Sequence, residues 1–330
     1  MGITHRTVTF VLVTCALLVA GAGWVAWGRG GPRSEPVHPT GTVPIADRST
    51  IRGRIAYSTL AGDIWVMNAN GSGRRRLTRS GRGNDFDPSW SPRARAIVFR
   101  TSRGHYVPDR AGRGAEGIFV VDARTKRQRE IEPRTGGLFP DWSPDGALIA
   151  FSGLRGLTGD SVHLMTPRGK HVRDLGSSGA GECATWSPDG GRIAYCGHGG
   201  DGNWAIWVMN RDGSSKRQLT HPVPSSPPGS GGDSPGAWSP DGRQIVYSGW
   251  HGDFDLFLMN SDGTDRRRLT DWPGGDGAQA WLPSGQIVFA HFTRDQRLPR
   301  WYLVNPDGSG LRSLPWLYGA GDPLDWIQLH

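Results

Sequence analysis

Residues 186–195 read WSPDGGRIAY, and closely similar stretches stand at 90–99 (WSPRARAIVF), 142–151 (WSPDGALIAF) and 238–247 (WSPDGRQIVY). Each begins with a tryptophan, passes through a turn that starts with Ser-Pro and ends in an apolar run. A weaker copy, WLPSGQIVF, begins at Trp281, and a last tryptophan follows close to the end of the chain. Successive tryptophans are 43 to 52 residues apart, so the chain is built from an internal repeat.

Most copies are followed by a second apolar run, such as IWVMN at 206–210 and LFLMN at 256–260, then an Asp-Gly turn and a short basic segment. Glycine accepts the positive φ that a tight hairpin needs, so Asp-Gly between apolar runs predicts hairpins. Each unit is therefore predicted to contain four short antiparallel strands, which we call A to D in chain order. Four-stranded units at this spacing are typical of β-propeller blades.

The repeat predicts six blades. Their B strands begin at Ile55, Ile97, Ile149, Ile193, Ile245 and Ile287. The first has no tryptophan-bearing strand before it, whereas Trp326 has no B strand after it. Both deficits disappear if the C-terminal strand pairs into blade 1 and closes the ring, which also removes exposed sheet edges. Residues 51–330 are thus predicted to form an all-β, six-bladed propeller.

The unit P-x-W-S-P-D-G-x-x-I-A-[FY], followed by [IL]-[WF]-[VL]-M-N-x-D-G, resembles the PD40 (WD40-like) repeat of the TolB-like six-bladed propeller family. The resemblance extends over residues 51–330. It implies a periplasmic or extracytoplasmic propeller that binds proteins or peptides through one face. The chain is expected to lack the separate α/β domain that precedes the propeller in TolB.

The N-terminal region reads as a membrane or export signal. Residues 7–27 carry no charge, and the segment is long enough to cross a bilayer as a helix. Residues 1–28 are either a transmembrane signal anchor, as Trp24 and Trp27 at interfacial positions suggest, or a signal peptide cleaved at an Ala-x-Ala stretch. Residues 29–50, rich in Pro and Gly, are predicted to be an extended linker. The predicted location is the cell membrane, single-pass with an extracytoplasmic propeller; the alternative is secreted or periplasmic.

Function is expected on the face that carries the B–C and D–A connections, here called the loop face. Its connections vary in length, and variable loops on a rigid scaffold commonly carry function. Carboxylates recur shortly before the strand-A tryptophans, and histidines follow several B strands. The predicted channel-mouth set is Asp85, Glu182, Asp233, Asp276, Asp322, His198, His251 and His291. Two interpretations are open: the acids hold a ligand's positive end or a Ca²⁺ ion in the central channel, or they cap turns and pair with arginines.

The opposite face, here called the turn face, carries the A–B and C–D turns. Its Asp residues are predicted to bond their own backbone. The net charge of +8 owes much to basic D strands, such as RRR at 74–76 and at 266–268. Charges there protect an outer edge from aggregation, and their spread around the rim does not form a nucleic-acid footprint. We therefore expect a monomer that binds a protein or peptide of the cell envelope, contacts the membrane through its N-terminal helix and binds no nucleic acid.

The sequence contains no nucleophile elbow, phosphate-binding loop or C-x-x-C pair. A binding module is therefore favoured over an enzyme. The alternative is an extracytoplasmic hydrolase or lyase that uses the channel-mouth carboxylates, because a glycosidase needs only two suitably separated acids.

Cys183 and Cys196 lie on the A and B strands of one predicted hairpin. Trp186 and Ile193 flank its turn, and an unbroken register carried back three residues places the two cysteines directly opposite each other. Opposed residues can come within disulfide reach, and an oxidising compartment favours the bond. The alternative is a pair of free, buried thiols.

Overall fold

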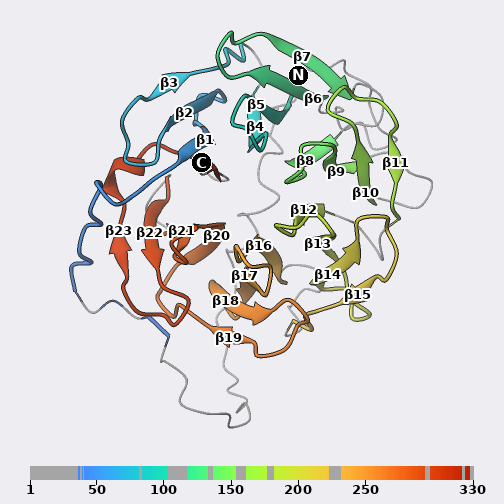
Figure 1. The fold of residues 1–330 in the computed structure, drawn as a ribbon. Helices are drawn as coiled ribbons and strands as arrows, with labels where there is room; N and C mark the ends of the chain where they lie inside the picture. The colour runs from blue at the N-terminus through green and yellow to red at the C-terminus, as the bar shows by residue number, and fades with distance from the viewer. Residues whose placement is uncertain are drawn as a thin grey trace, which may run out of the picture.

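The computed structural model of this 330-residue chain describes residues 36–37, 39, 41–81, 84–102, 117–132, 137–153, 161–176, 182–222, 232–293, 298–321 and 324–327. Within these ranges, six four-stranded antiparallel sheets surround a common axis (Figure 1). The six-bladed propeller predicted from the repeat is therefore confirmed. The predicted N-terminal helix, residues 1–28, lies outside the described residues.

Each blade runs from an inner strand near the axis to an outer strand at the rim. Blade 1 comprises β24 (Leu324–Ile327), β1 (Arg54–Ser58), β2 (Ile64–Asn68) and β3 (Arg75–Arg76). Blade 2 comprises β4 (Asp85–Trp90), β5 (Ala96–Thr101), β6 (Gly117–Asp122) and β7 (Gln128–Glu132). Blade 3 comprises β8 (Gly137–Trp142), β9 (Ile149–Gly153), β10 (Ser161–Met165) and β11 (Arg173–Asp174).

The remaining blades follow the same order. Blade 4 comprises β12 (Glu182–Trp186), β13 (Arg192–His198), β14 (Trp204–Asn210) and β15 (Arg217–Gln218). Blade 5 comprises β16 (Ser234–Trp238), β17 (Gln244–Trp250), β18 (Phe254–Asn260) and β19 (Arg267–Arg268). Blade 6 comprises β20 (Gly275–Trp281), β21 (Ile287–Phe292), β22 (Arg300–Val304) and β23 (Arg312–Ser313), followed by a 3-10 turn, η1 (Pro315–Leu317). In blade 1 the inner strand is the last of the chain, as the closure argument predicted.

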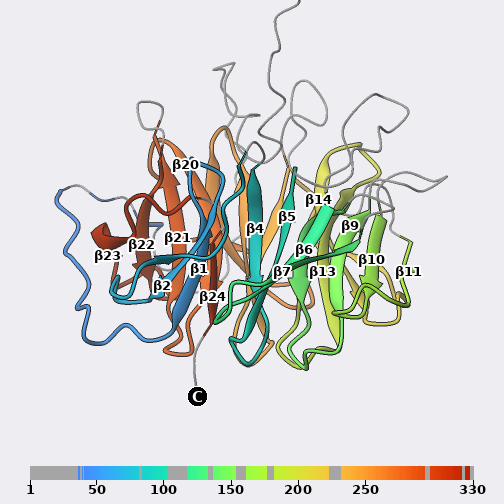
Figure 2. The same cartoon turned by 90° about the horizontal axis from the view of Figure 1, so that it is seen from above.

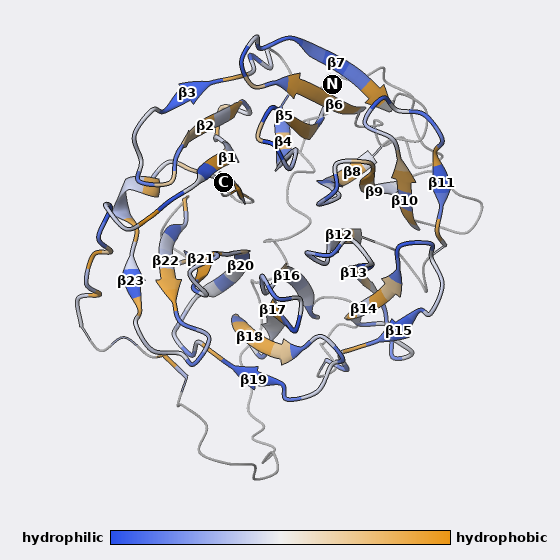
Figure 3. Cartoon of the chain, in the orientation of Figure 1, coloured by the Kyte–Doolittle hydropathy of each residue, from blue (hydrophilic) through white to orange (hydrophobic). Residues whose placement is uncertain are grey.

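The hydrophobic core is divided among the blade interfaces. The middle strands are apolar and the outer strands hydrophilic (Figure 3), so each sheet buries both faces against its neighbours. One cluster, for example, joins Val66 and Leu77 of blade 1 to Trp90 and Phe99 of blade 2. The strand-A tryptophans belong to this packing: Trp186, for example, is only 6% exposed. Burial between blades explains why the tryptophan recurs at one phase of the repeat.

Inner strands are interrupted by β-bulges. In blades 2 to 6 the register between strands A and B shifts shortly before the tryptophan. Asp87, Phe139 and Cys183 occupy equivalent bulge positions and have positive φ angles of 49°, 49° and 54°. A bulge adds one residue to one strand, which changes the pairing of everything beyond it.

The bulge corrects the predicted cysteine pairing. Cys196 lies opposite Glu182, while Cys183 is the bulged residue, at the point where the register shifts between Glu182 and Thr185. The expectation that the two cysteines face each other was wrong because it assumed an unbroken hairpin. Both are free cysteines in the structure, Cys196 buried and Cys183 partly buried.

The described residues between 36 and 46, here called the N-terminal strap, lie against the propeller. They form parallel bridges from Val37 to Thr270 in blade 5 and from Ile45 to Ser313 in blade 6. Backbone hydrogen bonds fix both ends, including Val37 N to Leu269 O at 2.8 Å. This part of the predicted linker is therefore docked on the outer sides of blades 5 and 6. No helix within the described ranges has the length and apolarity needed to cross a membrane.

Arginines on the outer strands connect neighbouring blades. In four blades an outer-strand guanidinium donates to a carbonyl oxygen in the C–D turn of the next blade. The pairs are Arg129 with Pro167, Arg173 with Arg211, Arg217 with Asp262, and Arg267 with Pro306. The basic D strands thus join blades as well as covering an outer edge.

Candidate functional site

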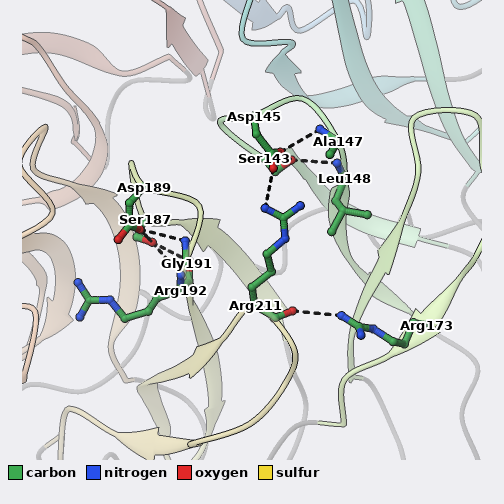
Figure 4. A network of polar contacts seen from close by, with 10 residues as sticks. All are labelled: Ser143, Asp145, Ala147, Leu148, Arg173, Ser187, Asp189, Gly191, Arg192 and Arg211. Carbon is green, nitrogen blue, oxygen red and sulfur yellow. Dashed lines mark hydrogen bonds and ion pairs between the residues drawn. The ribbon is translucent and has the colours of Figure 1, made fainter.

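The turn face is a regular lattice of local hydrogen bonds (Figure 4). In the A–B turn of blade 3, Asp145 accepts hydrogen bonds from the Ser143 hydroxyl at 2.6 Å and the Ala147 backbone at 2.9 Å. Asp189 repeats the arrangement in blade 4. Asp145 also pairs with Arg211 at 2.7 Å, and its pKa is lowered to about 2 because these hydrogen bonds and the guanidinium outweigh its desolvation. The prediction that these aspartates serve the turns is confirmed.

The loop face differs from the turn face in the length of its connections. The described turns on the opposite side are short and uniform (Figure 2). Connections on the loop face differ in length. The connection at residues 251–253 in blade 5 is short, whereas those at 102–116 in blade 2 and 219–233 between blades 4 and 5 are long. A rigid disc therefore presents one regular face and one face of varied loops.

Three of the predicted carboxylates, Asp85, Asp233 and Asp276, lie at the ends of D–A connections and are buried in separate surroundings. Asp85 opens β4 opposite Thr101 of β5 and is fully buried. Asp233 precedes β16, and burial raises its pKa to about 6 despite hydrogen bonds from the Thr220 hydroxyl and the Trp250 backbone. Such contacts tie each connection to adjacent strands, in agreement with the structural interpretation of these acids.

Asp276 and His291 are two predicted residues that the structure brings together. They are direct cross-strand partners on β20 and β21, and Nδ1 of His291 lies 2.7 Å from Oδ1 of Asp276. The Trp272 indole Nε1 lies 2.5 Å from the other carboxylate oxygen. Burial raises the pKa of Asp276, while the contact with His291 opposes that shift.

The other two predicted histidines make contacts within their own blades. His198 packs against Trp204, its cross-strand partner, with the rings tilted and 4.3 Å between their centroids. His251 has its Nδ1 3.0 Å from the Trp250 carbonyl oxygen and contacts the edge of Phe257. Burial lowers the pKa of His251.

The metal interpretation receives no support from the described residues. Among them, no group of three or more His, Cys, Asp and Glu side chains is arranged to hold an ion. The Glu182 backbone pairs with Cys196, but its side chain and the whole of Asp322 lie outside what the structure describes. A Ca²⁺ ion in the channel therefore stays a hypothesis from sequence.

A set of polar side chains on the inner strands, here called the polar belt, was not predicted from the sequence. In blades 1 to 3 the residue before the strand-A tryptophan accepts a hydrogen bond from the backbone N–H of the tryptophan in the next blade. The pairs are Asp325 with Trp90 at 2.5 Å, Ser89 with Trp142 at 3.1 Å, and Asp141 with Trp186 at 3.2 Å. The belt satisfies edge amides that no strand covers.

Two members of this belt are acids with raised pKa values. Burial raises the pKa of Asp141 to about 6, against hydrogen bonds that include one from the Ser89 hydroxyl at 2.9 Å. Burial also raises the pKa of Asp325 to about 7, and the charge of Asp141 adds to this shift. An Asp directly before Trp142 and before Trp326 was the signal in the sequence. These positions lie inside strand A, whereas the predicted acids were taken from the D–A connections.

The geometry agrees with a comparison against protein families. Residues 55–222 match the family described as the TolB beta propeller domain, PD40. The chain belongs to the TolB beta-propeller family. Membership rests on the same repeat that forms the A–B hairpins and the Asp-Gly turns described above.

Relatives of the TolB propeller family match only in part. A segment covering 25% of this chain and 17% of the relative is 32% identical to the Tol-Pal system protein TolB of Rhizorhabdus wittichii. TolB from Acinetobacter baumannii shares the fold with a TM-score of 0.65 and 19% identity, covering 83% of this chain and 66% of that one. A putative TolB from Agrobacterium tumefaciens shares the fold with a TM-score of 0.59 and 21% identity, covering 79% of this chain and 87% of that one. At these identities the structural likeness concerns the fold alone.

Proposed function

We propose that this chain is an extracytoplasmic propeller, membrane-tethered or secreted, that binds a protein or peptide of the cell envelope through its loop face. The observation that carries the proposal is the contrast between the two faces of the disc. The turn face uses its polar groups internally, whereas the loop face holds connections of unequal length on a rigid frame. Membership of the TolB propeller family, with a relative named for the Tol-Pal system, supports the same assignment.

Binding is favoured over hydrolysis by the state of the loop-face acids. Asp233 is engaged by Thr220 and the Trp250 backbone, and Asp276 by Trp272 and His291. A carboxylate held by such internal partners is poorly placed to exchange a proton with a substrate. The hydrolase or lyase alternative therefore gains no support from these two acids.

A photo-crosslinking experiment in living cells tests the proposal. The photoreactive residue p-benzoylphenylalanine is introduced singly at the exposed loop-face positions Asp201 and His251, and at the exposed turn-face positions Asp212 and Asp262 as matched controls. We expect one common adduct from the loop-face positions and none from the controls. Adducts confined to the turn-face positions, or none at any position, would overturn the assignment.

The compartment requires a separate test. Alkaline phosphatase, which is active only outside the cytoplasm, is fused after residue 330, because β24 ends on the turn face away from the loops. We expect an active fusion, and carbonate extraction then separates a tethered protein from a secreted one. An inactive fusion that is still full-length by immunoblot would exclude the extracytoplasmic location.

A further inference from the structure

A pocket of about 660 Å³ lies in blade 6, at the ends of β21 and β22 that flank the B–C connection. Aromatic side chains of Trp272, Trp301 and Tyr302 line it, and residues 41–43 of the N-terminal strap contribute to its wall. This volume falls within the range of sites for small organic molecules. The pocket is therefore large enough for a ligand and is partly apolar.

Three titratable side chains form a row beside this pocket. His291 is the direct cross-strand partner of Asp276 on one side and of Arg300 on the other. Directly opposed residues of neighbouring antiparallel strands point to the same face of a sheet. Asp276, His291 and Arg300 therefore share one face of blade 6, from the buried inner strand to the exposed start of β22.

The inner end of the row is fully engaged by the protein. Both Asp276 oxygens have partners, the Trp272 indole and the His291 Nδ1, and Asp276 is 2% exposed. The Trp272 ring lies on the His291 ring, with 4.3 Å between centroids. These contacts fix the imidazole plane, and Nε2 is the ring nitrogen that Asp276 does not use.

Two polar groups near the outer end of the row, on Arg300 and Thr293, are candidates to bind a ligand. Arg300 is exposed and lines the pocket, and no carboxylate pairs with it in the described part of the chain. The Thr293 hydroxyl, also in the pocket lining, is buried and has no hydrogen-bond partner among the residues that the structure describes. A buried hydroxyl left unpaired is costly, so an oxygen atom from a ligand or water would stabilise it.

We propose that this pocket binds a small organic carboxylate with a flat apolar body. The carboxylate lies between the Arg300 guanidinium and Nε2 of the His291 imidazole, and it accepts hydrogen bonds from the Arg300 guanidinium and the Thr293 hydroxyl. The apolar body packs against Trp272 and Tyr302, whose rings meet at 62° with centroids 5.1 Å apart. This site is additional to the partner-binding function proposed above and does not depend on it.

Calorimetric titration of the full-length protein with indole-3-acetate tests the site. We expect one ligand per chain, and binding weakened about tenfold or more in Arg300→Ala, because a charge-assisted hydrogen bond is lost. Thr293→Val removes an unpaired hydroxyl, so it keeps the fold and weakens binding several-fold. Arg312→Ala, whose guanidinium bonds the carbonyl of Leu311, is the matched control and keeps the wild-type affinity.

Two further probes identify the chemistry recognised. Indole-3-acetamide has the same shape without the charge, and we expect it to bind at least about tenfold more weakly. Phenyl phosphate is the other anion. Binding of phenyl phosphate but not indole-3-acetate would overturn the carboxylate assignment. The site would be overturned if Arg300→Ala, Thr293→Val and the wild type bound with equal affinity. It would also be overturned if a protein shown to be folded by its cooperative thermal unfolding gave no heat of binding with either probe.

Discussion

Trp326, close to the C-terminus, lies directly opposite Ile55 in the antiparallel pair formed by β24 and β1. Its indole Nε1 donates to the Arg52 carbonyl oxygen at 3.0 Å. Gly53, with φ of +113°, passes beneath this ring, where a Cβ would lie 2.7 Å from Nε1. The first sheet is therefore completed by residues from the opposite end of the chain.

Loss of the Trp326 side chain should weaken the closed ring. We expect Trp326→Ala to lower the free energy of unfolding by about 2–4 kcal/mol, somewhat less than for a fully buried tryptophan. Urea denaturation followed by circular dichroism measures the change. Tyr318→Ala, which removes an aromatic residue that is 69% exposed, is the control and should change stability by less than about 0.5 kcal/mol. Equal effects of the two substitutions would contradict closure through β24.

The interblade arginines should contribute modestly and locally. Arg173 donates to the Arg211 carbonyl oxygen at 3.2 Å and Arg217 to that of Asp262 at 2.7 Å. Each Ala substitution is expected to cost about 0.5–1 kcal/mol, because these hydrogen bonds are exposed to solvent. Guanidinium denaturation compares them with Arg312→Ala, because the Arg312 guanidinium bonds the carbonyl oxygen of Leu311 in its own blade. A control that loses as much stability would show that charge alone, not the interblade bond, is responsible.

The belt acid Asp325 should make stability fall as pH rises. Its pKa is raised to about 7, so the folded state holds this proton more tightly than the unfolded chain does. Its contribution is complete below about pH 4 and is lost as pH rises through 7. Asp325→Asn keeps an acceptor for the Trp90 N–H and cannot ionise.

Thermal unfolding at two pH values checks this assignment. We expect the free energy of unfolding of Asp325→Asn to come within about 1 kcal/mol of the wild type at pH 4 and to exceed it by about 2–4 kcal/mol at pH 8. Asp212→Asn is the control, because hydrogen bonds from Ser214 lower the pKa of that turn aspartate and its neutralisation brings no gain at pH 8. A variant less stable than wild type at pH 8 would refute a destabilising charge at Asp325.

The two propeller cysteines should behave as thiols of unequal accessibility. In a Cys15→Ser background, iodoacetamide without reductant should modify both Cys183 and Cys196 after denaturation. In the native protein Cys183 should react first, because Cys196 is only 3% exposed. Mass spectrometry of the intact protein counts the adducts. A denatured protein that takes up no iodoacetamide until it is reduced would show that the cysteines are bonded after all.

The architecture was predictable because it depends on a short-range pattern repeated along the chain. The tryptophan, the Asp-Gly turn and the apolar runs determine each hairpin locally, and the unmatched first and last strands indicate closure. The bulge was not anticipated, although Pro88 and Pro140, two residues before a strand-A tryptophan, were a usable signal, because proline is accommodated at bulges and free strand edges. Without that signal the register of Cys183 was carried one residue too far.

The candidate site was only partly predictable. The contact of Asp276 with His291 follows from one hairpin register, and both residues were named from sequence. Arg300 joins them through a second strand pair. Thr293 is distinguished only because its hydroxyl lacks a partner within the described part of the folded chain. Belt residues such as Asp325 act across blade boundaries, between positions far apart in the chain. Contacts of that kind depend on how the blades pack, which a single repeat does not encode.

The route of the N-terminal strap has a mechanical consequence. A force applied at residue 36 meets the bridge between Val37 and Thr270 in blade 5 first, then the bridge between Ile45 and Ser313 in blade 6. The sheet shared by β1 and β24 lies beyond both bridges along the chain. Tension from the N-terminal side would thus be borne by two complete blades before it reached the joint between the two ends of the polypeptide.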